Sequence, residues 1–216
     1  MTDELIDIRR DPGRPDFVVD GAPGAMLIII SGPSGVGKDT IIDALRRRER
    51  ETGRDGERHY VVTCTTRAPR NGERDGIDYH FVTRDEFERR RQAGDFLECF
   101  EVFGRGDWYG TLRSEVAPRL KEGKWVVLEI DVQGTLAVLN HYPDAVTIFI
   151  EPRSVEELER RLRLRGTETE AALERRLETA RRELAQAHLY RHRVMNDELD
   201  LAVVELCEIL KQNGDS

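Results

Sequence analysis

The segment at residues 27–40 constrains the fold more than any other part of the chain. It reads LIIISGPSGVGKDT, in which four apolar residues lead into a glycine-rich turn that ends in a lysine. An apolar run without polar alternation is typical of a buried parallel strand. After the turn, Ile41, Ile42 and Leu45 are spaced to lie on one side of a helix. The segment therefore predicts a strand at about 26–31, a loop, and a helix at about 38–50.

The turn fits the pattern G-x-x-x-x-G-K of loops that bind phosphate groups. Glycines allow the backbone to curl until several N–H groups point at one anion, and the following helix adds the positive end of its dipole. We therefore expect a nucleotide to bind here, with Lys38 reaching its β and γ phosphates. The residues expected to contact it are Gly32, Pro33, Ser34, Gly35, Val36, Gly37, Lys38, Asp39 and Thr40.

The loop departs from the pattern at one position. After the lysine the pattern has Ser or Thr, whose hydroxyl binds Mg²⁺, whereas this chain has Asp39, with Thr40 one place later. A carboxylate is a good Mg²⁺ ligand, but without the metal it repels a triphosphate by on the order of a few kcal/mol at a few ångströms. Two alternatives stay open: Asp39 coordinates the metal, directly or through water, or it points away and Thr40 assists.

The composition argues against several classes of protein. With 216 residues the chain can bury the core of one or two domains, and its formal net charge of −8 argues against nonspecific binding to nucleic acid. Any anionic substrate must therefore be held by a local cluster of Arg and Lys. No apolar run approaches the roughly 20 residues of a membrane span, and the acidic N-terminus lacks a signal-peptide pattern. We expect no nucleic-acid partner and no membrane partner.

The three cysteines and five histidines show no spacing typical of a metal site. The odd number of cysteines favours buried thiols in a reducing compartment over a disulfide framework. We therefore expect a cytoplasmic protein.

The rest of the chain alternates between apolar runs and helical patterns. Residues 1–24 are rich in Pro, Gly and charge, which predicts a flexible extension. Further strands are expected at 60–64, 77–82, 96–102, 125–131, 144–150 and 193–195, and further helices at 87–93, 113–122, 154–164, 170–189 and 197–210. Buried strands that alternate with helices predict an α/β fold with a parallel sheet and right-handed crossovers.

A series of short segments, in order along the chain, resembles guanylate kinase. They are TTRAPR at 65–70, followed by Gly72, Glu73, Gly76, Asp78 and Tyr79; FLE at 96–98; YGT at 109–111; EIDVQG at 129–134; RGTE at 165–168; and VMND at 194–197. The similarity runs from about Leu27 to Leu210. It implies a P-loop kinase fold, in which a parallel sheet core flanked by helices carries a GMP-binding subdomain and a helical lid.

The resemblance also implies a division of the chain and an activity. The kinase-like domain is expected at 25–212, with its core at 25–58, 113–160 and 191–212, the GMP-binding subdomain at 59–112 and the lid at 161–190. Family members transfer the γ-phosphoryl group of ATP to GMP, which makes ADP and GDP. ATP and GMP are therefore the expected substrates and Mg²⁺ the expected cofactor, in purine nucleotide metabolism. The oligomeric state stays open.

Two arginines and two tyrosines match the residues that hold the GMP phosphate in the family. Arg67 and Arg70 lie three residues apart on one expected loop, and two guanidinium groups can clamp a phosphate dianion with paired hydrogen bonds. Tyr79 and Tyr109 supply phenol donors for the remaining oxygens. Two loop arginines alone are more often a solvated surface, and it is the tyrosines and the family spacing that favour a phosphate site.

A second group of residues matches the family's contacts to the base of GMP. Guanine carries N–H and NH₂ donors on one edge, and Glu98 can accept both, whereas adenine would leave this carboxylate partly unpaired. The alternative is that Glu98 is an ordinary surface acid on a strand, but its apolar neighbours argue against full exposure. The remaining GMP-binding residues that the resemblance implies are Thr63, Thr111, Glu129 and Asp131.

Phosphoryl transfer requires in-line placement and cancellation of the charge on the transferred oxygens. The catalytic residues that the resemblance implies for this purpose are Lys38, Arg67, Arg161, Arg165 and Arg176. Arginines are so frequent in these helices that any one of them can be an ordinary salt-bridge partner, and the RGTE match favours Arg165. Asn196 matches the family's adenine-side residue. One further departure is the turn at 104–107, about two residues longer than usual, beside Tyr109.

Two other functions remain as alternatives. A ribose bisphosphate kinase of related build would also carry Lys-Asp-Thr at 38–40, but it would not need the residues that match guanine contacts. A non-catalytic guanylate-kinase-like binding module would typically lose the loop lysine and the lid arginines, which this chain keeps.

Overall fold

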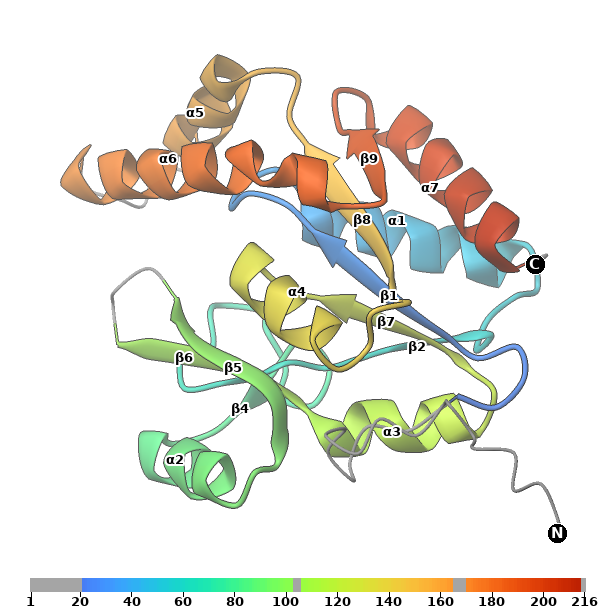
Figure 1. Ribbon diagram of the computed structural model, residues 1–216. Coiled ribbons are helices and arrows are strands. Elements are labelled where there is room, and N and C mark those ends of the chain that lie inside the picture. The colour runs from blue at the N-terminus through green and yellow to red at the C-terminus, as the bar shows by residue number, and fades with distance from the viewer. Residues whose placement is uncertain (1–20, 103–105, 165–169, 215–216) are drawn as a thin grey trace, which may run out of the picture.

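The computed structural model of the chain describes residues 21–102, 106–164 and 170–214. Five strands form the core sheet in the order β2-β7-β1-β8-β9, and every neighbouring pair is parallel (Figure 1). They are β1 (Met26–Ser31), β2 (Arg58–Tyr60), β7 (Trp125–Glu129), β8 (Val146–Glu151) and β9 (His192–Met195). The parallel α/β fold expected from the sequence is confirmed, while most of the expected extension, residues 1–20, lies outside the described residues.

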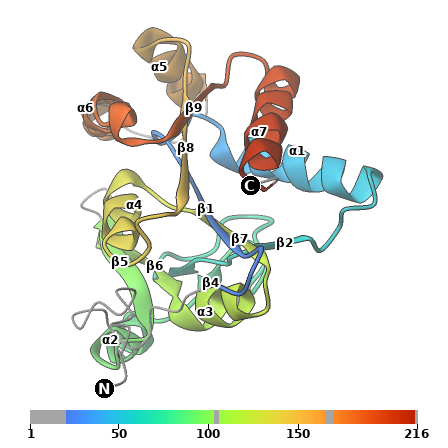
Figure 2. The ribbon, with the colours of Figure 1, turned by 45° about the vertical axis from the view of Figure 1, so that its right-hand side comes forward.

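Helices cover both faces of the core sheet (Figure 2). The first face carries α1 (Lys38–Glu51), α5 (Val155–Leu164), α6 (Glu170–Ala185) and α7 (Leu199–Gly214), and the second carries α3 (Arg113–Lys121) and α4 (Val132–Leu139). Ile28 and Ile30 of β1 pack toward the first group, and Leu27 and Ile29 toward the second. Because both faces of β1 are covered, its sequence shows no polar alternation. Among the described residues, no helix combines the length and apolar character needed to cross a bilayer.

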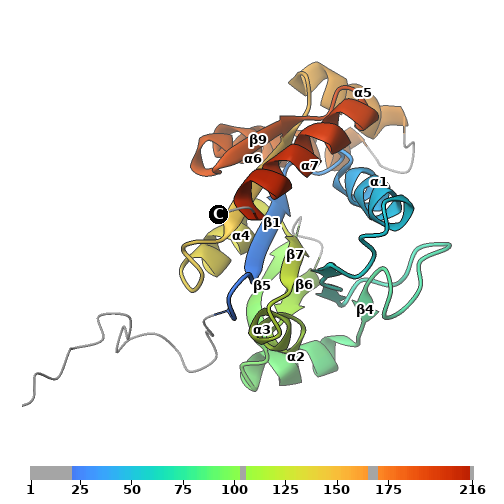
Figure 3. The same ribbon diagram turned by 90° about the vertical axis from the view of Figure 1, so that its right-hand side faces the viewer.

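A second sheet, with the order β4-β3-β6-β5, contains antiparallel pairs. Its elements are β3 (Cys64–Thr65), β4 (His80–Phe81), β5 (Phe96–Val102) and β6 (Asp107–Leu112), with α2 (Arg84–Gln92) packed on it. Phe87 of α2 stacks on Phe96 of β5, with ring centroids 4.4 Å apart. Figure 3 shows this sheet and α2 at the opposite end of the molecule from α5 and α6.

The structure corrects three expectations about secondary structure. The segment 60–64 is not one strand, because β2 ends at Tyr60 in the core sheet and β3 begins at Cys64 in the second sheet. Of 77–82 only His80 and Phe81 form a strand, since residues 76–78 make a turn. The helix α4 is missing from the sequence prediction. Its apolar residues continue the run of β7, and Gly134 weakens the helical pattern.

The parallel strands bring polar residues together at one edge. The carboxyl ends of β1, β7 and β8 lie on the same edge of the core sheet, because these strands pair in parallel. Residues 32–38, called the phosphate loop below, follow β1, and Asp131 follows β7. In α/β folds, ligands bind outside this edge of the sheet.

A substitution at Gly32 tests how closely the phosphate loop packs against the core sheet. Its φ is +147°, and a Cβ added there would overlap the carbonyl oxygen of Ile150 on β8. We expect Gly32→Ala to lower the free energy of unfolding by at least about 2 kcal/mol more than Gly53→Ala. Gly53 is the matched control, because its φ is also positive (+71°) but nothing lies within 4 Å of the added Cβ. Urea denaturation of both variants measures the difference, and equal losses would contradict it.

Candidate active site

The phosphate loop joins β1 to α1 through two left-handed glycines, Gly35 (φ +89°) and Gly37 (φ +95°). Gly37 is the N-cap of α1 and no side chain caps that helix, so its first N–H groups are suited to receive an anion. Lys38 Nζ donates to the carbonyl oxygens of Gly32 at 2.8 Å and Pro33 at 3.4 Å. The lysine is thereby folded over the loop that it is predicted to serve.

Three of the predicted ATP-side and lid residues contact the phosphate loop. Asn196 is buried and donates from Nδ2 to the carbonyl of Val36 at 2.7 Å. Arg161 of α5 donates to the same carbonyl at 3.4 Å and to the backbone oxygen of Asn196 at 3.0 Å. Arg176 of α6 donates to Ser34 Oγ at 2.6 Å. These contacts support the loop from outside, and Arg165, the fourth predicted residue of this group, lies outside the described residues.

Glu183 of α6 belongs to the same region, although the sequence analysis does not find it. Its carboxyl group accepts a hydrogen bond from the backbone N–H of Ser34, and its Oε2 is buried with no hydrogen-bond partner among the described residues. Burial raises the pKa of Glu183 to about 7, and nearby Lys38 counteracts this rise. One acid in a charge-rich helix gives no sequence signal of this kind, because the signal is its burial against the loop.

The structure also places Asp39, the unusual loop residue, beside Glu129 at the end of β7. The two carboxyl groups form a hydrogen bond, and burial together with the charge of Asp39 raises the pKa of Glu129 well above its usual range. The charge of Asp39 therefore favours the protonated form of Glu129. Thr40 is exposed in the first turn of α1.

Arg67, in the loop after β3, is the centre of the predicted GMP-phosphate group. Its Nε donates to the hydroxyl of Tyr109 at 3.0 Å, and its guanidinium lies 5.3 Å from the ring centroid of Tyr79. Tyr79 and Tyr109 meet edge to face, with ring centroids 5.9 Å apart. Arg70, the second predicted arginine, is exposed nearby. The structure therefore brings Arg67, Tyr79 and Tyr109 into one cluster.

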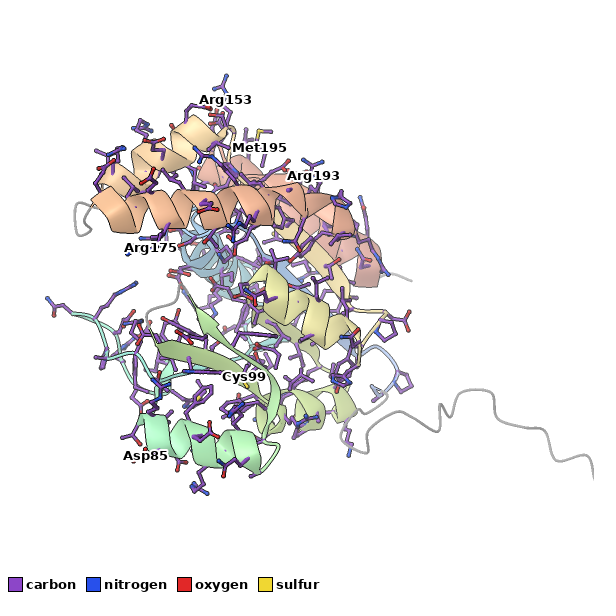
Figure 4. All side chains as sticks on the ribbon, turned by 60° about the vertical axis from the view of Figure 1, so that its left-hand side comes forward. Asp85, Cys99, Arg153, Arg175, Arg193 and Met195 are labelled. Carbon is purple, nitrogen blue, oxygen red and sulfur yellow. The ribbon has the colours of Figure 1, made fainter. Side chains whose placement is uncertain are left out.

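Tyr79 relates this cluster to the carboxyl groups of Glu129 and Asp39. Burial raises the pKa of the Tyr79 hydroxyl, and the negative charges of Glu129 and Asp39 raise it further. These charges act on Tyr79 because the carboxyl ends of the core strands face the second sheet. Figure 4 shows α5 and α6 on one side of this region and the second sheet on the other, with polar side chains projecting between them.

The predicted base-binding residues form a second cluster, on the β5–β6 hairpin and at the start of α4. Glu98 pairs with Thr111 across the two strands, and Thr111 Oγ1 donates to Glu98 Oε1 at 2.6 Å. The residue is only 9% exposed, and burial, with a smaller contribution from Asp131, raises the pKa of Glu98 to about 7. A Cβ added at Gly134 would lie 3.2 Å from Glu98 Oε2, so α4 closes over this carboxyl group.

Asp131 has a structural role besides its predicted one. It is the N-cap of α4, and its Oδ1 accepts the backbone N–H of Gly134 at 2.7 Å. Thr63, the remaining predicted base contact, lies half-buried between β2 and β3. Among the described residues, no group of three or more His, Cys, Asp or Glu side chains is arranged to hold a metal ion.

Comparison with known proteins relates this geometry to one family. The Guanylate kinase family model matches residues 24–213. Guanylate kinase of Rhodopirellula baltica is 53% identical over 186 residues, covering 85% of this chain and 86% of the relative, and guanylate kinase of Gloeobacter violaceus is 48% identical over 197 residues, covering 90% and 89%. The crystal structure of guanylate kinase from Anaplasma phagocytophilum aligns with a TM-score of 0.70 at 29% identity, covering 89% of this chain and 87% of that one.

The buried Glu98 predicts a pH-dependent stability. Its pKa is about 7 in the folded chain, above its ordinary value of 4.5, so the folded state binds the proton more tightly than the unfolded state. As the pH rises from about 4.5 to about 7, the free energy of unfolding of the wild type should therefore fall by up to about 3 kcal/mol relative to that of Glu98→Gln, whose amide carries no charge. Urea denaturation at pH 5 and pH 8 measures this difference.

The matched control for this prediction is Glu101→Gln on the same strand, where the side chain is exposed. This control should follow the wild type at both pH values. A Glu98→Gln variant that keeps the same stability difference from wild type at pH 5 and pH 8 would contradict the buried carboxyl.

Proposed function

The chain belongs to the guanylate kinase family, and from this premise we propose that it transfers the γ-phosphoryl group of ATP to GMP, with Mg²⁺, to give ADP and GDP. The observation that carries the proposal is the buried carboxyl group of Glu98, which accepts a hydrogen bond from Thr111 and lies near Asp131. It is an acceptor in a desolvated place, which suits a base that presents two donors on one edge. A base without those donors would leave it unpaired, at a cost of about 1–3 kcal/mol.

In this proposal the phosphate loop binds ATP. The uncapped N-terminus of α1 and the left-handed glycines supply N–H groups for the β and γ phosphates. Lys38 exchanges the carbonyl oxygens of Gly32 and Pro33 for phosphate oxygens, which are better partners because they are charged. Asn196 and Arg161 keep the loop in shape through Val36.

GMP is proposed to lie on the second sheet, between the two clusters described above. Glu98, Thr111, Thr63 and Asp131 would hold its base, and Arg67, Arg70, Tyr79 and Tyr109 its phosphate. Glu129 would lie between the two nucleotides, since its charge acts on Tyr79 on the GMP side and its carboxyl group contacts Asp39 on the ATP side. This places the acceptor phosphate in front of the loop that holds the donor.

We also propose the division expected from the sequence, with residues 59–112 as the GMP-binding subdomain and 161–190 as the lid. α6 reaches the phosphate loop through Arg176 and Glu183, so a movement of this helix is transmitted to the loop. Closure of the lid would bring arginines to the transferred phosphoryl group and exclude water that would otherwise hydrolyse ATP.

The residues present fit Mg²⁺. This ion prefers oxygen ligands, keeps several waters and is usually bound by one or two carboxylates together with substrate phosphates. Asp39, directly after the phosphate loop, and Glu129, at the end of β7, offer two carboxyl groups in contact, and both would be available as ligands once Glu129 is ionised. When bound, the ion would offset negative charge between the β and γ phosphates.

The three cysteines suit the cytoplasm, where a purine nucleotide kinase would meet its substrates. Cys64, Cys99 and Cys207 are free thiols in the structure. Thiols that stay reduced are the rule in that compartment.

An ADP-release assay tests the proposed function directly. ATP and Mg²⁺ are supplied with GMP, dGMP, AMP or a ribose bisphosphate as the acceptor, and ADP formation is followed with a coupled enzyme. ADP release that depends on GMP and is absent with AMP supports the proposal. Turnover of the ribose bisphosphate without turnover of GMP, or no ATP binding at millimolar nucleotide, would overturn it in favour of the two alternatives.

Glu98→Gln should reduce the use of GMP far more than the binding of ATP. The amide keeps one acceptor and adds donors that face the donors of guanine, so we expect kcat/KM for GMP to fall about 10–100-fold and KM for ATP to stay unchanged. In the wild type, kcat/KM for GMP should rise with pH until about pH 7, as Glu98 ionises. In the variant only the rise caused by ionisation of the GMP phosphate, whose second pKa is about 6, should remain. Equal losses for both nucleotides would mean that Glu98 is structural.

Asp39→Ser restores the residue type of the usual motif and should keep activity. Because it removes one carboxyl group beside Glu129, the Mg²⁺ concentration for half-maximal rate should rise several-fold. Asp43→Ser, at an exposed position one turn further along α1, is the control and should not change the Mg²⁺ dependence. Complete loss of activity in Asp39→Ser would show instead that Asp39 is essential.

A further inference from the structure

Glu73 lies in the loop between β3 and β4 and has no part in the function proposed above. Its Oε1 accepts Nη2 of Arg67 at 2.9 Å, and its Oε2 accepts Nη1 of Arg67 at 3.0 Å. The same Oε2 accepts the backbone N–H of Arg70 at 2.6 Å. One carboxylate therefore joins the two arginines that are proposed to hold the phosphate of GMP.

This pair is unlike the surface ion pairs of the helices. The side chains of Arg67 and Glu73 are only 13% and 19% exposed, and their contact is bidentate. A bidentate contact between two mostly buried side chains fixes the orientation of a guanidinium, whereas the bidentate pairs of the helices, such as Arg89–Glu86, leave the arginine exposed. The hydrogen bonds from Arg67 and from the Arg70 backbone keep the pKa of Glu73 below its usual range even though desolvation opposes this, so it is a carboxylate at neutral pH.

The remaining contacts of Arg67 leave one N–H for a ligand. Of its five N–H donors, Nη1 uses both on Glu73 and the carbonyl of Ala68 (2.6 Å), Nη2 uses one on Glu73, and Nε uses its own on the Tyr109 hydroxyl. The second hydrogen of Nη2 has no acceptor in the part of the chain that the structure describes. It lies on the same edge as Nε, where the hydroxyl of Tyr109 keeps its own proton to donate.

The faces of the guanidinium are confined as well. Its carbon lies 5.3 Å from the ring centroid of Tyr79 and 5.8 Å from that of Phe81. Aromatic contact on the face and Glu73 on one edge together prevent the group from turning. The remaining N–H of Arg67 consequently faces one direction, with Tyr109 beside it.

We propose that Glu73 is a positioning residue for the phosphate of the acceptor nucleotide. By holding the Nη1–Nη2 edge of Arg67, it presents the second Nη2 hydrogen and the neighbouring Tyr109 hydroxyl to the phosphate. Through the Arg70 N–H it fixes the backbone from which the second arginine extends. The proposal rests on the function proposed above. Experiment can separate this proposal from the opposite one, in which Glu73 weakens GMP binding because its carboxylate repels the phosphate or competes with it for Arg67.

Binding of GMP and of guanosine to Glu73→Gln tests the proposal. Loss of orientation should raise the Kd of GMP about tenfold, while the Kd of guanosine, which has no phosphate, should stay as in the wild type. In turnover, KM for GMP should rise with kcat at saturating GMP largely kept and KM for ATP unchanged. Titration calorimetry gives the two dissociation constants, with guanosine measured by competition.

Two further variants make the comparison sharp. Glu86→Gln, on the helix α2 that packs on the same sheet, breaks ion pairs with Arg89 and Arg90, and the variant should bind GMP as the wild type does. Glu73→Asp keeps the charge on a shorter side chain and should recover part of the lost GMP affinity. It also serves in place of Glu73→Gln if thermal unfolding shows that the latter does not fold.

The outcomes that would overturn the proposal are distinct. Equal losses for GMP and guanosine would make Glu73 a structural residue of the loop, and unchanged or tighter GMP binding in Glu73→Gln would make it a bystander or a competitor. The proposed function itself fails at an earlier step, in the wild type, if GMP neither binds nor stimulates release of ADP.

Discussion

A parallel strand buried on both faces can place charged groups and a free backbone turn only where it ends, and the site of this protein depends on that constraint. β1 is covered by helices on both faces, so its first free backbone turn is the phosphate loop. Gly32 makes this turn in contact with the carbonyl of Ile150 on the neighbouring strand. The direction of the parallel strands then brings the end of β7, with Glu129 and Asp131, to the same edge.

Carboxyl groups at this edge are held in places that water reaches poorly. Burial raises the pKa of Glu98, of Glu183 and of Glu129, and in each case another acid contributes to the rise. Keeping such groups costs stability at neutral pH, because the unfolded chain would ionise them freely. A site that must meet donor groups of a ligand or a metal ion gains from this arrangement, since the ligand offsets the desolvation of these carboxyl groups.

Arginine is handled in the opposite way. Arg67 has a carboxylate, a phenol and two aromatic rings around it before any ligand arrives. Arg161 and Arg176 are likewise bound to the phosphate loop. Orienting a long side chain in advance removes part of the entropy cost of binding. The acids are therefore held in a desolvated state that raises their pKa, and the arginines are held in place by several partners.

Local pattern accounts for much of the fold and for the chemistry of the loop. The apolar run of β1, the G-x-x-x-x-G-K turn and the amphipathic start of α1 are each determined by residues close together in the chain, and the structure confirms all three elements. The resemblance to a family adds which residues to examine, but not how they are arranged. Pattern fails at α4, which begins where the run of β7 ends, and at 60–64, where the chain passes from one sheet to the other.

Sequence by itself determined the parallel α/β core, the phosphate loop and the residue types available to it, because these follow from spacing over a few residues. Only the tertiary structure decided three contacts: the hydrogen bond between Glu183 and the Ser34 backbone, the hydrogen bond between Asp39 and Glu129, and the ion pair between Glu73 and Arg67. Burial is the physical reason for the difference. The residue type of an acid does not show whether its side chain is solvated or buried. Its pKa and its partners are set by segments that lie far away along the chain or fold back through a loop.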